Sequence, residues 1–231
     1  MKVPLSPRLR ACCNFISPGD RVADVGTDHG YLGIWLLQQG IARSVIASDI
    51  VPGPLSAAKN NAVKYGTANQ MEFYLSNGLQ NVPKDFDTMV CAGMGGDTMI
   101  SILSAAPWMK DPKYRMVLQC QSKTPMLRQY LSENGWRITE ETALQDGRFL
   151  YTVMEVYYQP NYPKLTAGEC YFPPAILENP SLHTAAYYRW VVGGLQISTS
   201  HQDDPEKKQA LNELIAMADA PELTWLKEET Q

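Results

Sequence analysis

The stretch Arg21 to Gly33, which reads RVADVGTDHGYLG, constrains the fold more than any other part of the sequence. Its apolar start, Val22 to Val25, predicts a strand that is buried on both faces of a parallel sheet, and Gly26 ends the run. From Tyr31 to Gly40 the apolar residues recur at helical spacing. The stretch therefore predicts a strand, a tight turn and a helix, which is the repeating unit of α/β sheets.

The turn between these two elements suits a polar or anionic ligand, because the start of a helix leaves backbone N–H groups unpaired. Asp24 lies before the turn, and Gly26 and Gly30 bracket it. Many doubly wound proteins use such glycines only to pack a helix against a strand. Asp49 favours a nucleotide-type ligand, because it ends the next apolar run, where an acidic side chain accepts hydrogen bonds from ribose hydroxyls.

Two glycine-containing segments follow later strands. Met71 to Leu75 predicts a third strand, after which Asn77 and Gly78 either form the turn or lie beside an adenine ring. A fourth strand, predicted over 87–92, runs into the sequence Gly93-Met94-Gly95-Gly96. Three glycines in four positions predict a loop, which is either a tight connection or a surface facing a planar substrate.

Basic residues occur in two places near the expected site. Ser6-Pro7 predicts the start of a helix, because a hydroxyl caps it and proline suits its first turn, and Arg8 and Arg10 project from this helix. The window 110–128 is the most basic in the chain, and it contains Lys110, Lys113, Lys123 and Arg128 around a predicted fifth strand over 116–120. Each group is either a solvated surface or a contact for phosphate groups.

Composition narrows the class of protein. The net charge of −4 is uneven, since residues 1–164 carry +2 and residues 165–231 carry −6. No signal peptide and no apolar run of about 18 residues is present, so we expect a cytoplasmic protein without a membrane partner. The five cysteines have no CxxC spacing and the three histidines are scattered, which predicts reduced thiols and no metal site. The oligomeric state stays open.

The composition of the sequence and its pattern of predicted elements change near residue 160. Before it, strands and helices alternate and end in a hairpin predicted over 136–142 and 149–158. After it, prolines predict a linker, and two helices predicted over 181–197 and 205–217 suit an antiparallel helical hairpin. We therefore expect an α/β domain at 1–160 and a linker with a helical extension at 161–231.

The order of the motifs LSPRL, ADVGTDHGYL, NGL and AGMGG, followed by a helical extension, resembles the bacterial tRNA (adenine-22 N1)-methyltransferase family. This family belongs to the class I S-adenosylmethionine-dependent methyltransferases, and the resemblance covers essentially the whole chain. It implies a Rossmann-like seven-stranded sheet in the order 3-2-1-4-5-7-6 and a coiled-coil-like C-terminal extension. It also implies transfer of a methyl group to N1 of an adenine in tRNA.

The motifs and this resemblance together define the expected site. The cofactor-binding residues are Asp24, Gly26, Gly30, Asp49, Asn77, Gly78, Gly93 and Met94. The residues expected to contact RNA are Arg8, Arg10, Gly95, Gly96, Lys123 and Arg128. The chain departs from the family at Asn77, where an acidic residue is common, and at 119–122, where a QPN-like sequence is frequent; the role of the latter segment stays open.

The chemistry indicates two catalytic candidates. N1 of adenine carries a lone pair, so the enzyme mainly has to align N1 with the methyl carbon and the sulfur. Attack leaves the adenine cationic, and a nearby carboxylate stabilises that charge and accepts a proton from the exocyclic amine. Asp28 and His29 are the candidates; alternatively, Asp28 caps the turn and His29 packs behind it. No Asn/Asp-Pro-Pro-aromatic sequence, which commonly holds an exocyclic amine, follows the fourth strand, and this favours a ring nitrogen.

Three other functions fit part of the pattern. A small-molecule methyltransferase would keep the cofactor motifs and ignore RNA. A noncatalytic S-adenosylmethionine-binding protein would use the helical hairpin to hold a protein partner. A nicotinamide enzyme would also use Asp49, but the sequence DHG in the turn and the AGMGG segment disfavour it.

Overall fold

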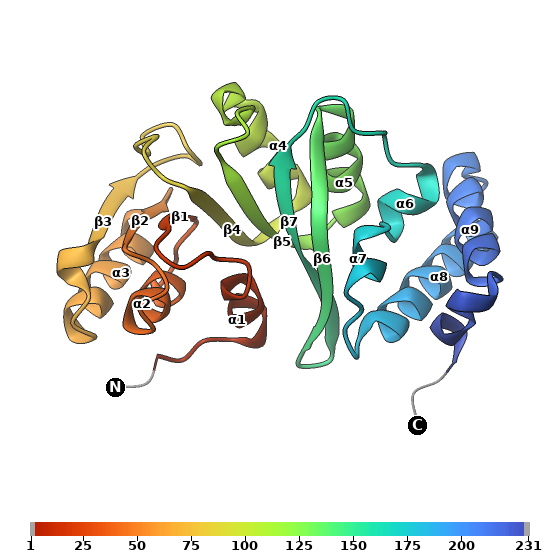
Figure 1. The fold of residues 1–231 in the computed structure, drawn as a ribbon, viewed down its shortest axis with the longest axis horizontal. Coiled ribbons are helices and arrows are strands. Elements are labelled where there is room, and N and C mark those ends of the chain that lie inside the picture. Colours follow the sequence, from red (N-terminus) through yellow and green to blue (C-terminus); the bar gives the residue numbers. More distant parts are fainter. Residues whose placement is uncertain (1–2, 229–231) are drawn as a thin grey trace.

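Seven strands form one mixed sheet in the order β3-β2-β1-β4-β5-β7-β6, which confirms the order implied by the resemblance (Figure 1). The structure is a computed structural model and describes residues 3–228. Strands β1 to β5 run parallel, and β7 lies antiparallel between β5 and β6. The strands are β1 (Arg21–Val25), β2 (Ser44–Asp49), β3 (Met71–Leu75), β4 (Thr88–Gly95), β5 (Arg115–Ser122), β6 (Trp136–Asp146) and β7 (Phe149–Tyr158).

Helices cover both faces of the sheet because successive side chains of a buried strand point to opposite faces. In β4, Val90 packs with α1 to α3 on one face, whereas Met89 and Cys91 pack with α4 and α5 on the other. The helices of this part are α1 (Pro7–Cys13), α2 (Tyr31–Gln38), α3 (Pro52–Lys64), α4 (Gly96–Ser104) and α5 (Thr124–Glu133), with short 3-10 helices η1 (Ala68–Gln70) and η2 (Pro107–Met109).

Helix α1 begins where the sequence predicts. The Ser6 hydroxyl accepts a hydrogen bond from the Leu9 backbone N–H at 3.4 Å, and Pro7 occupies the first turn. Cys12 and Cys13 on this helix are buried in the core. All five cysteines are buried and free.

Strand β4 is longer than expected, and this corrects the prediction of a loop at Gly93-Met94-Gly95-Gly96. The strand continues through Gly95, with register shifts against β5 on either side of Met94, and α4 follows directly from Gly96. Gly93 has a φ of 80°, and its N–H donates to the Gln119 side chain at 3.1 Å instead of joining a regular ladder. The glycines therefore form a bulge inside the strand.

The C-terminal region continues the fold at the far edge of the sheet (Figure 1). The expected linker contains two short helices, α6 (Ala167–Tyr171) and α7 (Ala175–Glu178), and α6 begins with a capping box formed by Thr166 and Glu169. The helical hairpin is α8 (Thr184–His201) with α9 (Pro205–Ala218), followed by the 3-10 helix η3 (Pro221–Lys227). These helices share a core that also includes Ala143 of β6. No helix in residues 3–228 is long and apolar enough to cross a bilayer.

Candidate functional site

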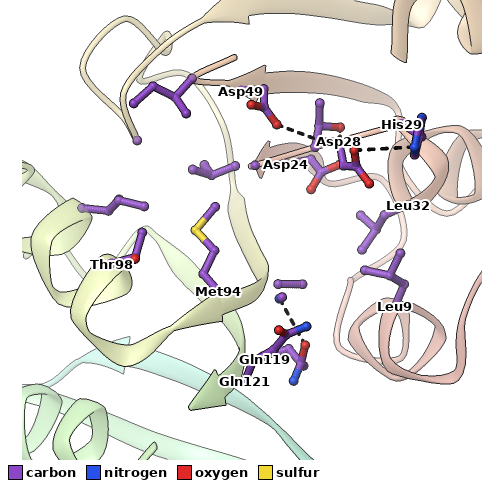
Figure 2. A pocket seen from close by; sticks show the side chains of 18 of the residues that line it. Leu9, Asp24, Asp28, His29, Leu32, Asp49, Met94, Thr98, Gln119 and Gln121 are labelled. Atoms are coloured by element: carbon purple, nitrogen blue, oxygen red, sulfur yellow. Dashed lines mark hydrogen bonds and ion pairs between the residues drawn. The ribbon is translucent and has the colours of Figure 1, made fainter. Parts of the chain in front are cut away.

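A cavity of about 470 Å³ opens at the carboxyl ends of the parallel strands, where open α/β sheets bind their ligands (Figure 2). Segments that follow β1, β2 and β3 meet there with the end of β4 and residues of β5 and α1. Figure 2 shows the carboxylates of Asp24, Asp28 and Asp49 gathered on one side, with Met94 across from them. The topology therefore places most of the predicted site residues together.

The glycine turn after β1 forms one wall of this cavity. The backbone N–H groups of Gly26 and Thr27 both donate to the Ser48 carbonyl, at 2.8 and 2.9 Å, which ties the turn to β2. Gly26 has a φ of 77°, and a Cβ atom there would lie 2.1 Å from the Met94 methyl carbon. Gly30 caps α2 with a φ of 72° and packs against Ala58. Both glycines are required by backbone conformation and close packing.

Asp24 lies at the base of the turn and is 5% exposed. Burial raises the pKa of its carboxyl to about 6; the Thr27 hydroxyl, which donates to it at 2.7 Å, opposes this shift, and Asp49 and Asp28 add to it. A carboxyl whose pKa is higher in the folded state makes the protein less stable as pH rises from its unfolded value toward 6. Ionisation of Asp24 near neutral pH therefore lowers the free energy of unfolding.

Replacing this residue by asparagine tests that cost. We expect Asp24→Asn to match the wild type near pH 4 and to be more stable by on the order of 2 kcal/mol near pH 7, because the amide carries no buried charge. Urea denaturation at pH 4, 5, 6 and 7 measures the difference. Asp111→Asn, which alters a carboxylate whose side chain is 46% exposed, is the control, and a pH-independent difference for Asp24→Asn would contradict the assignment.

Asp49 ends β2 and joins the glycine turn to the loop after β2. One carboxylate oxygen accepts from the Asp28 backbone N–H at 3.2 Å, and the other accepts from the Val51 N–H at 2.9 Å. Each carboxylate oxygen has a further acceptor site, so the side chain retains capacity for hydroxyl donors in the cavity. This geometry suits the two hydroxyls of a ribose.

The segment after β3 forms the neighbouring wall. The Ser76 N–H donates to the Asp49 carbonyl at 2.9 Å, and the Ser76 hydroxyl donates to the Gly78 carbonyl at the same distance. Gly78 has a φ of 56°, and a Cβ there would lie 2.8 Å from an Ile102 methylene. Asn77 is exposed and lines the cavity beside it. The turn therefore presents an amide side chain and bare backbone to the ligand.

Asp28 and His29 lie at the mouth of the cavity. Their side chains are 70% and 52% exposed, and Asp28 Oδ1 is 3.7 Å from His29 Nε2. Asp28 has a φ of 51°, one of two positive values among the non-glycine residues described, and such strain persists only where surrounding contacts fix it. Asn61 supplies one such contact by donating to the His29 carbonyl at 2.9 Å.

The four residues at the end of β4 and the start of α4 have two different environments. Gly93 and Met94 line the cavity, as the cofactor prediction requires of them. Gly95 and Gly96, which we expected beside the substrate, pack against β5 and the segment after it: a Cβ on Gly95 would lie 3.0 Å from the Ser122 hydroxyl, and one on Gly96 would lie 2.7 Å from the Lys123 carbonyl. Neither lines the cavity, so their observed role is close backbone packing.

The predicted basic residues separate in the structure. Arg8 lines the cavity, where its Nε donates to Asp146 at 2.7 Å, whereas Arg10 lies over the Trp35 ring outside it. Lys123 follows β5, is 59% exposed and pairs with Asp97. Lys110 and Lys113 precede β5 and so lie near the amino ends of the parallel strands, whereas the cavity lies at their carboxyl ends. The basic window therefore does not form one surface near the cavity.

Arg128 does not contact solvent, and its assignment to an RNA-binding face was wrong. Its side chain is fully buried and paired with Glu141 of β6, which is equally buried. The guanidinium also donates to the carbonyls of Cys170 and Tyr171 and to the Tyr187 hydroxyl, at 2.8 to 3.1 Å. Burial alone lowers the pKa of Arg128, and the Glu141 charge outweighs this effect and raises it. The residue anchors the C-terminal helices to the sheet.

Several residues that line the cavity were not predicted as site residues from the sequence. Gln119, in the segment left without a role, is buried and holds Gly93 through its side-chain oxygen. Gln121 is exposed and points into the cavity (Figure 2). The other lining residues that were not among the predicted site residues include Ser6, Leu9, Tyr31, Leu32, Thr98 and Ile102. The alternation of side chains along β5 could have indicated Gln121, because Gln119 and Gln121 lie on the same face of the strand end.

Within residues 3–228, no three His, Cys, Asp or Glu side chains are grouped to hold a metal ion.

Comparison with known proteins decides the family. A methyltransferase-domain family model matches residues 5–154. The chain is 31% identical over 165 residues to a putative tRNA methyltransferase of Mycoplasma genitalium, and the alignment covers 70% of this chain and 73% of that protein. It is 29% identical over 154 residues to the tRNA (adenine(22)-N(1))-methyltransferase of Bacillus subtilis, covering 66% and 65% of the two chains. The chain belongs to the tRNA (adenine-22 N1)-methyltransferase family. The alignment thus spans slightly less than two thirds of the Bacillus subtilis protein.

Solved structures agree over a longer part of the chain. A putative tRNA (m1A22) methyltransferase of Streptococcus pneumoniae in complex with S-adenosyl-L-methionine has a TM-score of 0.81 at 28% identity, covering 91% of this chain and 99% of that one. The structure of a related M. capricolum protein with S-adenosylhomocysteine has a TM-score of 0.77 at 25% identity. The fold and family are those of class I S-adenosylmethionine-dependent methyltransferases.

Proposed function

We propose that the protein transfers a methyl group from S-adenosylmethionine to N1 of adenine 22 in tRNA. In this proposal residues 1–160 carry the transfer and residues 161–231 form the helical extension. The observation that supports it most is the link between Asp28 and Asp49: the carboxylate suited to a ribose also holds the backbone of the exposed carboxylate at the cavity mouth. One hydrogen bond, from the Asp28 N–H to the Asp49 carboxylate, thus connects the residue proposed to bind the cofactor with the residue proposed to face the reacting base.

The cavity residues fit the cofactor in shape and in chemistry. Asp49 has acceptor capacity for the ribose, and Asn77 and Gly78 form the wall expected beside the adenine. Gly93 is exposed, and a Cβ there would meet only the Gln121 side chain at 3.6 Å, so its backbone is open to the methionine portion; Gly26 lines the cavity beside the Met94 methyl group. Bound there, S-adenosylmethionine supplies an electrophilic methyl group. Cytoplasmic tRNA is the partner that this reaction requires.

The chain's own residues provide alignment and a negative charge. The lone pair of N1 points at the methyl carbon without prior loss of a proton, so positioning supplies much of the rate. The N1–methyl bond would form as the methyl–sulfur bond breaks, so the positive charge would move from the sulfur to the adenine, and the Asp28 carboxylate at the mouth is placed to stabilise it there. Loss of a proton from the exocyclic amine then restores a neutral base, with Asp28 or His29 as the acceptor.

The proposed activity is tested with labelled S-adenosylmethionine and two tRNA transcripts that differ only in having adenine or guanine at position 22. We expect label on the adenine transcript alone, at N1 of that base. Equal labelling of both transcripts would reject the position. Absence of label from both, with normal cofactor binding, would reject the RNA substrate and favour a small molecule.

The role of Asp28 has its own test. We expect Asp28→Asn to lower kcat about tenfold while the Kd for S-adenosylmethionine changes by less than about twofold, because an exposed carboxylate exerts a screened, moderate field. Asparagine also tolerates the positive φ at this position. Single-turnover methylation measures the rate. Asp111→Asn, at the opposite sheet edge, serves as the control, and an unchanged kcat would assign Asp28 to the turn alone.

A further inference from the structure

A second hollow lies between the segment that follows β5 and helix α8. This hollow, here named the α8 groove, has a volume of about 300 Å³, the lower end of the range for small-ligand pockets. Its walls include Lys123, Tyr187, Trp190, Gly194, Ser198 and Lys207. Gln121 lines both this groove and the cavity of the active site. The two hollows are therefore neighbours across a single side chain.

The groove presents an aromatic surface that the fold does not use. Trp190 is 61% exposed, although large aromatic side chains usually lie in cores or interfaces. Its ring centroid is 5.8 Å from that of Tyr187, whose hydroxyl is bound by Arg128. The indole therefore packs against a fixed neighbour and still exposes part of its surface. Such a surface suits the flat face of a nucleobase.

Gly194 has no side chain at a position where a side chain would not disturb the packing of the fold. It lies inside the 18-residue helix α8, and an added Cβ would meet no atom within 4 Å. Glycine inside a helix is less favourable than alanine, and neither packing nor a positive φ requires it here. Its effect is to leave the floor of the groove open beside Trp190.

The charges bordering the groove have one sign. Lys123 and Lys207 are the charged residues among those that line it. Each forms an ion pair at the surface, with Asp97 and Asp204 respectively. Ion pairs near the surface contribute little, so a phosphate group can compete for these ammonium groups. The combination of an aromatic wall and lysines is typical of sites for single-stranded nucleic acid.

We propose that the α8 groove holds an unstacked nucleotide of tRNA that adjoins the adenine in the active-site cavity. This inference rests on the proposed function, because the continuity through Gln121 connects the groove to the methylated base. A base that leaves its stack exposes the face of its neighbour, and stacking of that neighbour on Trp190 compensates for the loss. Lys123 and Lys207 then contact the adjoining phosphates.

Paired glycine substitutions test the proposal without weakening the helix. Gly194→Leu fills the groove, whereas Gly193→Leu makes the same change at the adjacent position, which does not line it and also has nothing within 4 Å of an added Cβ. Leucine favours a helix over glycine, so both variants are expected to fold. The measurements are the Kd for the adenine-22 transcript, the Kd for S-adenosylmethionine and the sedimentation behaviour of each protein.

We expect Gly194→Leu and Trp190→Ala to weaken tRNA binding about tenfold, in the range that one lost stacking contact produces. Gly193→Leu and Trp190→Phe should bind tRNA within about twofold of the wild type, and all four should bind S-adenosylmethionine normally. Equal tRNA affinity of Gly194→Leu and Gly193→Leu would overturn the proposal while leaving the proposed function intact. A change in self-association confined to Gly194→Leu would overturn it in favour of a second copy of the chain. Failure of the wild type to bind tRNA would reject both proposals together.

Discussion

Replacing Arg128 with methionine is expected to lower the free energy of unfolding by about 3–5 kcal/mol, because it leaves a buried carboxylate without its counterion. Arg128 and Glu141 are both fully buried, and the guanidinium also binds the Thr152 and Tyr187 hydroxyls. Methionine fills similar space but offers no donor to any of these groups. Urea denaturation at pH 7, followed by circular dichroism, measures the loss.

Two further variants identify the cause of that loss. Lys208→Met breaks an exposed ion pair with Asp203, and we expect it to cost less than about 1 kcal/mol. The double replacement Arg128→Met with Glu141→Leu removes both buried charges and should regain part of the stability. A single Arg128→Met variant as stable as Lys208→Met would show that the buried pair does not support the fold.

Replacing Asp49 with asparagine is expected to weaken S-adenosylmethionine binding about 100-fold, since hydrogen bonds to a charged group are each worth about 1.5–3 kcal/mol. Both carboxylate oxygens already accept backbone N–H groups, from Asp28 and Val51. An amide has one oxygen, so its NH₂ group would face a donor and the turn would loosen as well. Isothermal titration calorimetry measures the affinity directly.

The matched control is Asp87→Asn. Asp87 accepts a hydrogen bond from the Arg21 backbone N–H at 2.7 Å, but it lies at the amino ends of the parallel strands, away from the cavity. We expect this variant to bind S-adenosylmethionine like the wild type. If Asp49→Asn also binds normally, the ribose contact assigned to Asp49 is incorrect, whereas parallel losses in both variants would point to a general weakening of the sheet.

Local patterns in the sequence were sufficient to bring together the main residues that we predict to bind the cofactor. An apolar strand, a glycine turn and an acidic residue at the end of the next strand are each encoded within a few residues, and parallel strands bring their ends together. Asp24, Gly26 and Asp49 accordingly meet at one cavity. The order of the seven strands depends on contacts between distant segments, and it was available only through resemblance to a family.

Burial was the property that the sequence did not reveal. Arg128 lies in a window rich in lysine and arginine, which suggests an exposed surface. A better signal was its place in α5, because Leu127 and Leu131 flank it on the buried face of that helix. A charge on an apolar helix face requires a buried partner, and Glu141 of β6 supplies it.

The glycines of β4 show a second limit of local patterns. Gly93, Gly95 and Gly96 predict a break in the strand, because glycine is unfavourable inside one. The strand continues since the Gln119 side chain replaces a ladder acceptor and the backbone near Lys123 packs closely on Gly96. Both contacts come from β5 or the residue after it, 26 or more positions along the chain.

The buried guanidinium also bears on where this protein can be divided. A chain shortened to residues 1–160 would retain every strand, yet Arg128 would lose the carbonyls of Cys170 and Tyr171 and the hydroxyl of Tyr187. Ala143, which packs in the core of the C-terminal helices, would become exposed on β6. Residue 160 marks a change in composition, while the contacts that maintain cooperativity run across it. The catalytic sheet and the helical extension are therefore expected to unfold in a single transition.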